Sequence, residues 1–290
     1  MYLYNGKIKR YKPDIAEQKY KDKRANSKRY YRCLECVKFL NYVVEMFNKK
    51  GWSLDASVGY APKNNLFSTD EMVCTKTLYN YVNLGILPIK NIDLPEKLKR
   101  NTKSSSTRKN RKILGKSIEE RPETVNLREE FGHWEIDSVL GKKKDTEPAI
   151  MTIVERKTRM SLWIKIKDHS SMAIDEALQS LINRFGAKKS EVFKSITGDN
   201  GSEFANLSNI ENNGISVYFT HPYTSCEKGT NECHNKMLRR FISKGKSIDD
   251  YSAEDILFFS DTINGLPRKI LNYHTPEELF ETQLDRIYAT

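Results

Sequence analysis

The sequence predicts an α/β protein in which a basic, all-helical region precedes a domain built on a mixed five-stranded sheet with flanking helices. Charge is the first observation behind this: residues 1–126 carry 27 Lys and Arg against 13 Asp and Glu, whereas the rest of the chain carries 22 against 25. The second is a change of pattern near residue 127, where helical periodicity gives way to alternating strands and helices. We therefore expect a helical region over 1–96, a basic linker over 97–126 and an α/β domain over 127–290.

Composition is that of a folded protein. The chain has 290 residues, of which 38% are hydrophobic and 10% aromatic, enough for a sizeable core. It has no run of 18 apolar residues, and its start, "MYLYNGKIKRYK", has no apolar signal segment, so we expect neither membrane insertion nor export. Five cysteines in no regular framework favour a reducing compartment, and we expect a cytoplasmic protein.

The basic front half is typical of an electrostatic handle for a polyanion. An acidic membrane surface is the rival partner, but the sequence shows neither an amphipathic anchor nor a lipidation site. Residues 97–116, "KLKRNTKSSSTRKNRKILGK", contain nine basic residues in twenty. This stretch is compatible with a solvated linker and with an arm that follows DNA phosphates, and one segment can do both.

Helices are expected in the front half. Residues 1–32 are basic and polar, either helical or loosely ordered, and residues 33–48 have the apolar spacing of an amphipathic helix. Residues 68–84 indicate a capped helix pair that starts at Ser68 or Thr69 and ends before Gly85. Two short helices in a basic region are typical of a helix-turn-helix, although any small helical hairpin has a similar pattern. If the pair reads DNA, the expected contacts from its second helix are Thr75, Lys76, Thr77 and Tyr79.

The back half alternates between strands and helices. Five stretches have strand character: "HWEIDSVLG", "PAIMTIVERKT", "MSLWIKIKD", "VFKSITGD" and "ISVYFTHP". One helix is expected over "SSMAIDEALQSLINRFG" and another from near Thr230 in "KGTNECHNKMLRRFI". This order of elements predicts a mixed sheet covered by helices.

Three acids stand at informative places in that pattern. Asp137 lies at the centre of the first strand, on the face that also carries His133 and Glu135. Asp199 ends the fourth strand in "TGDNGSEF", a stretch that taken alone fits an ordinary capped turn. Glu232 lies in the first turn of the later helix. If the first and fourth strands are neighbours, Asp137 and Asp199 approach each other, and the helix can bring Glu232 to the same point.

Converging carboxylates repel one another unless they bind hard cations, for which Mg²⁺ is the natural choice and Mn²⁺ a substitute. Two such ions about 3.5–4 Å apart would hold the attacking and leaving oxygens of a phosphoryl displacement. Cations and an amide lie near Glu232 on the same helix face, as a DNA-cutting site requires. These expected DNA contacts are Lys228, Asn235, Lys236 and Arg239.

Within a resemblance that covers roughly residues 68–282, five blocks occur in order: "GHWEID", "IVERKTR", "TGDNGSEF", "YFTHPYTSCEKGTNECHNKMLRRFISKG" and "LPRKILNYHTPEELF". Together they resemble the DDE transposases of the insertion sequence thirty family and, more broadly, the integrase catalytic core with its ribonuclease H-like fold. The resemblance implies that Asp137, Asp199 and Glu232 are a metal-binding catalytic triad. It also implies double-stranded DNA as partner, both as element ends and as target, a homo-oligomeric synaptic complex and a nucleoid-associated location.

The sequence departs from the family pattern in "TSCEKGTNEC", where Cys233 replaces a usual Asn, and in "INGLPRK". Such transposases commonly carry a further helix-turn-helix ahead of this start, so we expect the chain to begin inside a longer gene. Two rival functions remain open: a nuclease of the same fold without strand transfer, and a non-catalytic DNA-binding remnant acting as a repressor.

Other candidate residues have weaker patterns. Cys33 and Cys36 form a lone CxxC, which fits a helix face better than a zinc site. Cys226, Cys233 and His234 lie beside the acids, but thiolates do not suit a hard-metal centre. His221 is either a strand-end residue or a contact to phosphate or water. Glu135 competes with Asp137 as a ligand, and Glu203 is expected either to support the site from outside it or to be a surface acid. Arg268 and Lys269 either contact the DNA backbone or form a solvated turn.

Overall fold

A computed structural model describes most of the chain: residues 3–4, 7–8, 11–27, 32–95, 114–142, 147–221, 227 and 229–289. Most of the predicted basic linker lies outside this part, as do Lys228 and Cys226. Within it, no helix has both the length and the apolar composition needed to cross a membrane.

The front half is mainly helical, as predicted, but two short strands pair near its start. Its elements are β1 (Leu3–Tyr4), β2 (Lys7–Ile8), α1 (Pro13–Asn26), α2 (Val37–Lys50), α3 (Leu54–Lys63) and α4 (Thr75–Asn83). α2 begins later than expected, and Leu34, placed on it by the sequence pattern, is exposed. It ends at Gly51, whose φ of 65° suits a residue without Cβ.

One part of the predicted helix pair is wrong. The helix expected from Ser68 is a single 3₁₀ turn, Thr69–Glu71, because Met72 and Val73 leave it in extended form to enter the core of the helical region. The partner that packs on α4 is instead α3, which the sequence pattern did not reveal. α4 itself lies where predicted and ends before Gly85.

The back half contains the predicted mixed sheet of five strands. In spatial order these are β5 (Ser161–Ile166), β4 (Ala149–Glu155), β3 (His133–Leu140), β6 (Ser195–Gly198) and β7 (Ser216–Phe219). β3, β4 and β5 pair antiparallel, whereas β6 and β7 join β3 in parallel. The first and fourth strands of this domain are therefore neighbours.

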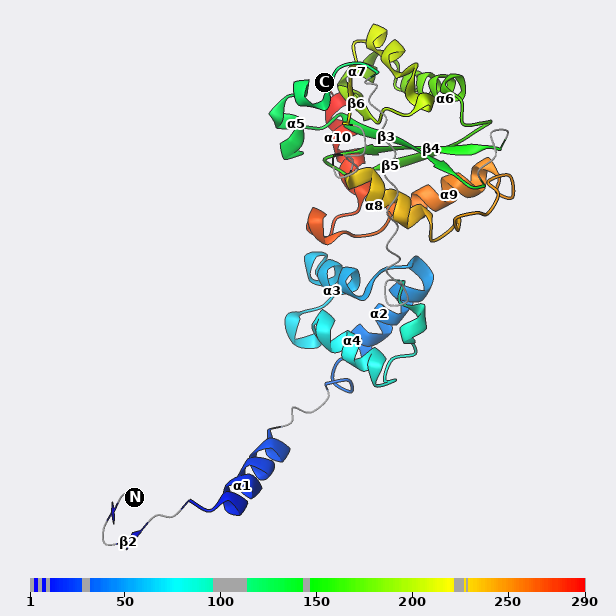
Figure 1. Cartoon of the computed structure of the whole chain (residues 1–290). Helices are drawn as coiled ribbons and strands as arrows, with labels where there is room; N and C mark the ends of the chain where they lie inside the picture. Colours follow the sequence, from blue (N-terminus) through cyan, green and yellow to red (C-terminus); the bar gives the residue numbers. More distant parts are fainter. Residues whose placement is uncertain are drawn as a thin grey trace.

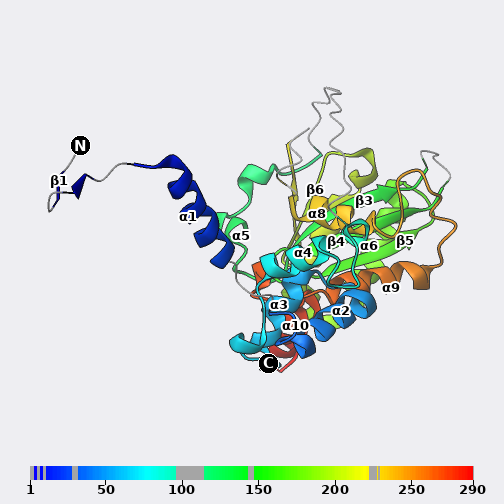
Figure 2. The same cartoon turned by 90° about the horizontal axis from the view of Figure 1, so that it is seen from below.

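Helices cover both faces of the sheet (Figure 1). The helices of this half are α5 (Glu123–Leu127), α6 (Ser171–Asn183), α7 (Lys189–Val192), α8 (Gly229–Leu238), α9 (Ala253–Asn264) and α10 (Pro276–Tyr288). α6 and α7 lie on one side and α8 and α9 on the other, with α9 alongside β5 in the view from below (Figure 2). The sheet is thus the middle of three layers, and the face under α8 carries Asp137.

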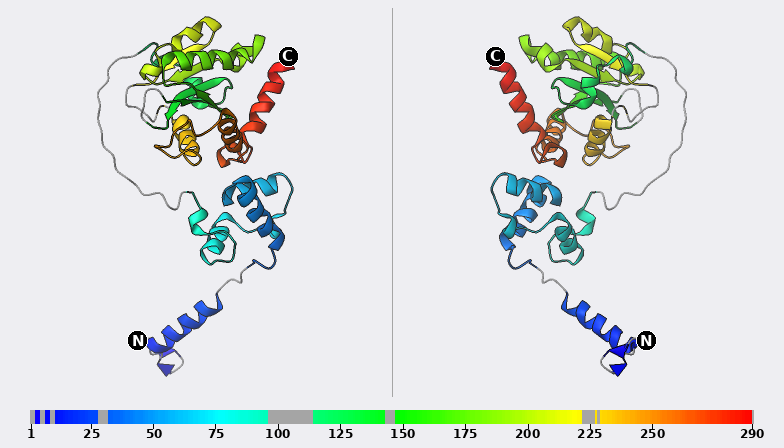
Figure 3. Two further views of the ribbon diagram at one scale, coloured as in Figure 1. Left: turned by 90° about the vertical axis from the view of Figure 1, so that its right-hand side faces the viewer. Right: turned by 90° about the vertical axis from the view of Figure 1, so that its left-hand side faces the viewer.

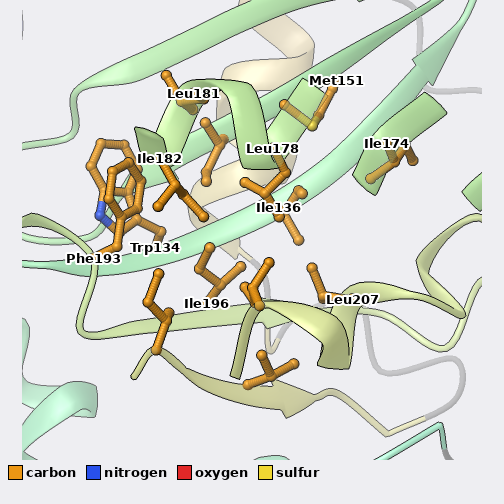
Figure 4. Packing of buried hydrophobic residues seen from close by; sticks show 14 of the residues in the cluster. Trp134, Ile136, Met151, Ile174, Leu178, Leu181, Ile182, Phe193, Ile196 and Leu207 are labelled. Atoms are coloured by element: carbon orange, nitrogen blue, oxygen red, sulfur yellow. The ribbon is translucent and has the colours of Figure 1, made fainter. Parts of the chain in front are cut away.

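The side chains of β3 point alternately into two different hydrophobic cores. Trp134 and Ile136 point to the α6 side, where they join Ile196 and Phe193 in the main core (Figure 4). Val139, on the opposite face, belongs to a smaller core under α8 and α9. Because side chains alternate along a strand, Asp137 shares the face of Val139 and not that of Trp134.

The helical region contacts the sheet domain through the turn before α10, as the side views in Figure 3 show. Tyr273 packs its ring against Gly59 of α3 and donates its hydroxyl to Asp55 at 3.4 Å. Lys63 Nζ donates to the carbonyl of Asn272 at 2.9 Å. Both turn residues have positive φ, 51° at Asn272 and 61° at Tyr273, so this turn is held in a specific conformation to reach α3.

Replacing Gly59 with alanine is expected to destabilise the protein by roughly 1–3 kcal/mol, because the new methyl group would overlap the Tyr273 ring. Chemical denaturation compares this variant with Gly265→Ala, whose methyl group would meet its nearest atom at 3.5 Å. Equal stability of the two variants would contradict the packing of Tyr273 on α3.

Candidate active site

Two of the predicted acids lie on adjacent strands. β3 and β6 are parallel with Glu135 opposite Thr197, so Asp137 and Asp199 stand two residues further along, at the same end of the pair. His169, in the loop before α6, is close enough to both acids to feel their charge. A hydrogen bond with Glu203 and the charges of Glu203, Asp199 and Asp137 raise the pKa of its imidazole. His169 therefore lies within electrostatic reach of all three carboxylates.

Asp137 is oriented by α8. Asn235 Nδ2 donates to Asp137 Oδ2 at 2.6 Å. Thr152, the residue opposite Asp137 on β4, donates its hydroxyl at 3.3 Å to Asn235 Oδ1. The Thr152 contact sets which side of the amide faces the carboxylate. Asn235, which stays a predicted DNA contact, also fixes the direction of an acid.

The "TGDNGSEF" stretch forms a turn in which Asp199 and Asn200 make different hydrogen bonds. Asp199 Oδ1 accepts the amide of Gly201 at 3.1 Å. Asn200 bonds the carbonyl of Thr220 and accepts the amide of Leu114, which ties the turn to the end of β7. A Cβ at Gly201 would overlap the carboxylate of Glu203 and would therefore push that side chain out of its present position. The turn therefore presents Asp199 while folding Glu203 back beside it.

Glu203 contacts Ser138 of β3 and His169, which precedes α6. Its Oε1 lies 3.2 Å from Ser138 Oγ and 3.3 Å from His169 Nε2. Burial opposes ionisation of Glu203, but its hydrogen bonds, first that with His169, outweigh burial and lower the pKa of the carboxyl. Sequence reasoning missed His169, because a lone histidine in a polar loop has no periodicity or spacing to mark it.

Glu232 lies in the first turn of α8 and is partly exposed. It precedes Asn235 by three residues, so both share one helix face, and α8 packs on β3 and β4. Among the described residues, no three His, Cys, Asp or Glu side chains are already gathered tightly enough to count as a metal-binding group. The oxygen donors of Asp137, Asp199 and Glu232 nevertheless match the chemistry of a hard divalent cation.

Glu135, the rival ligand, is bound elsewhere. Its side chain is fully buried, and Oε1 pairs with Arg156 Nη1 at 2.5 Å. Oε2 accepts the backbone amide of Asn231 at 3.1 Å. Both oxygens are thus engaged by the protein, whereas Asp137 is partly exposed.

The expected DNA contacts near Glu232 divide into two groups. Lys236 and Lys269 are exposed, so a DNA phosphate could reach their side chains. Arg239 Nη2 donates to the carbonyl of Leu140, and Arg268 donates to His234 and to the carbonyl of Ile263. These two arginines are therefore engaged by the fold itself.

The expected base-reading residues of α4 also differ in setting. Lys76 and Tyr79 are exposed, but Tyr79 lines a cavity of about 850 Å³ that also borders Arg240 of the sheet domain. Thr75 donates to Asp55, the residue that Tyr273 contacts, and Thr77 lies 3.3 Å from the sulfur of Cys74. Of the four, Lys76 is the one that the structure leaves most available.

Most of the remaining cysteine and histidine candidates lie where burial or a contact within the protein accounts for them. Cys36 is buried in the helical region, and Cys33 is partly buried against the same core. Cys233 is an exposed free thiol. Burial lowers the pKa of His234 to about 3, and its ring contacts the Thr230 carbonyl and Arg268. His221 pairs with Glu227 at 2.8 Å, which raises the pKa of the imidazole.

A pH-dependent contact joins β3 to β6 at the end opposite the acids. Hydrogen bonds from Lys194 and His133 lower the pKa of Glu130 from 4.5 to about 2. A carboxyl with a depressed pKa stabilises the fold above its unfolded pKa, and the gain is lost as pH falls from 4.5 towards 2. Solvent screens this 45% exposed side chain, so Glu130→Gln is expected to cost roughly 0.5–1 kcal/mol at pH 7. Urea unfolding should show the difference from wild type vanishing near pH 2; a constant difference would contradict the assignment.

Comparison with known proteins gives the class of this domain. Residues 128–225 match the integrase core domain family. The match includes Asp137 and Asp199, and Glu232 follows it by seven residues. With the five-stranded mixed sheet and flanking helices, it confirms the ribonuclease H-like fold of an integrase catalytic core.

Several curated proteins are similar to this chain. It is 45% identical over 207 residues to the probable transposase for insertion-like sequence element IS1161 of Streptococcus salivarius, covering 71% of this chain and 58% of that protein. It is 32% identical over 170 residues to transposase InsI for insertion sequence element IS30A of Escherichia coli (strain K12), covering 58% and 43%. The chain is thus similar to transposases of insertion sequence elements, and its residues 128–225 match an integrase core domain.

The chain spans about half the length of these relatives. Among solved structures, the catalytic core domain of BIV integrase aligns with a TM-score of 0.40 at 19% identity, covering 54% of this chain and 98% of that one. That similarity is too distant to support an argument about function.

Proposed function

We propose that this chain is the catalytic part of a DDE transposase, which cleaves DNA at the ends of an insertion element and transfers the resulting 3′-hydroxyl to target DNA. The observation that carries the proposal is the placement of Asp137 beside Asp199 across the β3–β6 pair, under the helix that bears Glu232. Homology to insertion-element transposases supports the same reaction.

Asp137, Asp199 and Glu232 are the residues that would hold divalent metal. We favour Mg²⁺, with two ions and with Mn²⁺ as a substitute, because the donors are carboxylate oxygens. Bound there, the metal would supply a reactive water and stabilise charge that develops on the phosphate. Asn235 keeps Asp137 directed at this region, and Thr152 keeps Asn235 directed at Asp137.

Exposed cations extend the site towards a DNA backbone. Lys236 follows Glu232 by one helical turn, and Lys269 and Lys76 lie on exposed positions of other elements. Lysine contacts with phosphates raise affinity without reading sequence, and salt weakens them. The proposed partner is double-stranded DNA, as element ends and as target, bound by a homo-oligomeric synaptic complex.

The test is cleavage of a DNA fragment that carries the gene's own flanking sequence, in Mg²⁺ or Mn²⁺ and at moderate salt. Site-specific nicks are expected from the wild type and not from Asp199→Asn. A labelled 3′-hydroxyl end should then join a plasmid. Nicks without joining would identify a nuclease, and metal-independent binding without any nick would identify a DNA-binding repressor.

A further inference from the structure

We propose that the buried Glu135–Arg156 ion pair is a positioning device, which holds the first turn of α8 against β3 and so places Glu232 opposite Asp137. This inference rests on the proposed function for its purpose, but the contacts on which it stands belong to the fold. Neither Glu135 nor Arg156 is given a role by the proposed chemistry.

The two carboxylate oxygens of Glu135 bind different partners, one on the turn after β4 and one on α8. Oε1 pairs with Arg156, whose side chain is 4% exposed, and Oε2 accepts the amide of Asn231, the residue before Glu232. The side chain of Asn231 is fully buried, and within the described residues its amide group has no hydrogen-bond partner. The first turn of α8 is therefore held here through its backbone, at Glu135.

A second contact between α8 and β3 matches the first in spacing. Asn231 bonds Glu135, and Asn235 bonds Asp137. Four residues of helix rise about 6 Å, and two residues of strand rise about 6.6 Å. The helix can thus lie along the strand and bond it at two successive positions of one face. Glu232 lies between these bonds, so its backbone position is set by both.

The turn after β4 reinforces the first of these positions. It carries Arg156 and also Arg159, whose Nη1 donates to Thr230 Oγ1 at 2.9 Å. Glu155 accepts the amides of Lys157 and Thr158 within this turn, which fixes the directions of both arginines. One rigid turn therefore supports the start of α8 through two separate contacts.

Energetics favour a positioning role over a stabilising one. Removing two charges from water costs about as much as their attraction returns, so a buried ion pair is weak evidence of stability. Replacing both partners by apolar residues of similar volume is often neutral for stability. The Glu135–Arg156 pair can therefore be removed as a pair while the fold is kept, which makes the proposal testable.

The test is the double variant Glu135→Met/Arg156→Met, with Ser260→Ala as a matched control. Ser260 is equally buried and bonds the carbonyl of Ser161 at 2.7 Å, but it lies on α9 and supports β5. Two quantities are measured: Mn²⁺ binding by calorimetry, and amide hydrogen exchange of α8. In the double variant we expect Mn²⁺ affinity to fall on the order of tenfold, as for residues that support metal ligands. The Asn231 amide should exchange on the order of tenfold faster, and Ser260→Ala should change neither quantity.

Two results would overturn the proposal: exchange at Asn231 equal to wild type, or Mn²⁺ affinity within about twofold of wild type although the variant is folded. If the double variant does not fold, Glu135→Gln takes its place, because it keeps the size of the side chain and removes the charge that pairs with Arg156. Smaller changes in the same two quantities are then expected. If the wild type itself binds no Mn²⁺, the proposed metal site has failed. Faster exchange at Asn231 would then still support the device, and unchanged exchange would refute it.

Discussion

Replacing Asp137 with asparagine is expected to lower metal-dependent DNA cleavage at least about a thousandfold. The substitution keeps the shape of the side chain and removes the charge that would hold a cation. A bound metal contributes several kcal/mol to charge stabilisation in such reactions, and each 1.36 kcal/mol corresponds to about tenfold in rate. Single-turnover cleavage of a pre-bound DNA fragment measures the effect on the chemical step.

Asp249→Asn is the control for this change. Asp249 is an exposed carboxylate that lies 3.8 Å from Lys165, away from β6. Its loss removes one negative charge from the same domain, and cleavage is expected to stay within about twofold of wild type. DNA binding by Asp137→Asn should also persist, because phosphate contacts come from other residues. Full cleavage by Asp137→Asn would remove this residue from the site and reopen the choice of ligand.

Replacing Trp134 with alanine is expected to destabilise the protein by about 3–5 kcal/mol. Trp134 is fully buried, stacks on Phe193 with ring centres 4.9 Å apart and meets Phe280 edge-on. Its indole also donates to the carbonyl of Val192 at 2.8 Å. The variant would lose this packing and leave the carbonyl without its partner. Urea unfolding followed by circular dichroism measures the loss.

Trp134→Phe separates the two contributions. It keeps an aromatic ring against Phe193 but removes the donor to Val192, so a loss of about 1–2 kcal/mol is expected. Equal losses for both variants would mean that the hydrogen bond dominates and that the stacking is of little value. Because Trp134 and Asp137 lie on opposite faces of β3, these variants test whether that strand has the register on which the site depends.

The sheet was predictable because its strands carry simple local patterns. All five expected strands are present, and the first and fourth are neighbours, which the approach of Asp137 and Asp199 required but the order of elements alone did not fix. The pairing of α3 with α4 was not predictable in this way. Ser68 and Glu71 form a good helix start, and only the burial of Met72 and Val73 in the helical core ends the helix after one turn.

Within the site, strand alternation left Glu135 and Asp137 equivalent, since both face α8. Tertiary contacts distinguish them: Glu135 meets Arg156 and Asn231, which come from distant segments. The same limit applies to Asn235, Arg239 and Arg268. A polar side chain next to an acid on a helix suggests contact with a ligand, but a carbonyl or carboxylate of the protein satisfies it equally well. Sequence spacing does not reveal which partner is nearer.

The arrangement of β3 and β6 has a consequence for synthesis of the chain. Asp137 belongs to an early strand of the domain, Asp199 becomes its neighbour only after the helical crossover, and Glu232 follows Asp137 by 95 residues. Domains form from the N-terminal side as the ribosome extends them. A product interrupted between residues 199 and 232 would carry the basic front half and two of the acids, but not Glu232. Such a fragment would keep the cationic residues without the full set of acids, so the proposed function predicts that it binds DNA but does not cleave it.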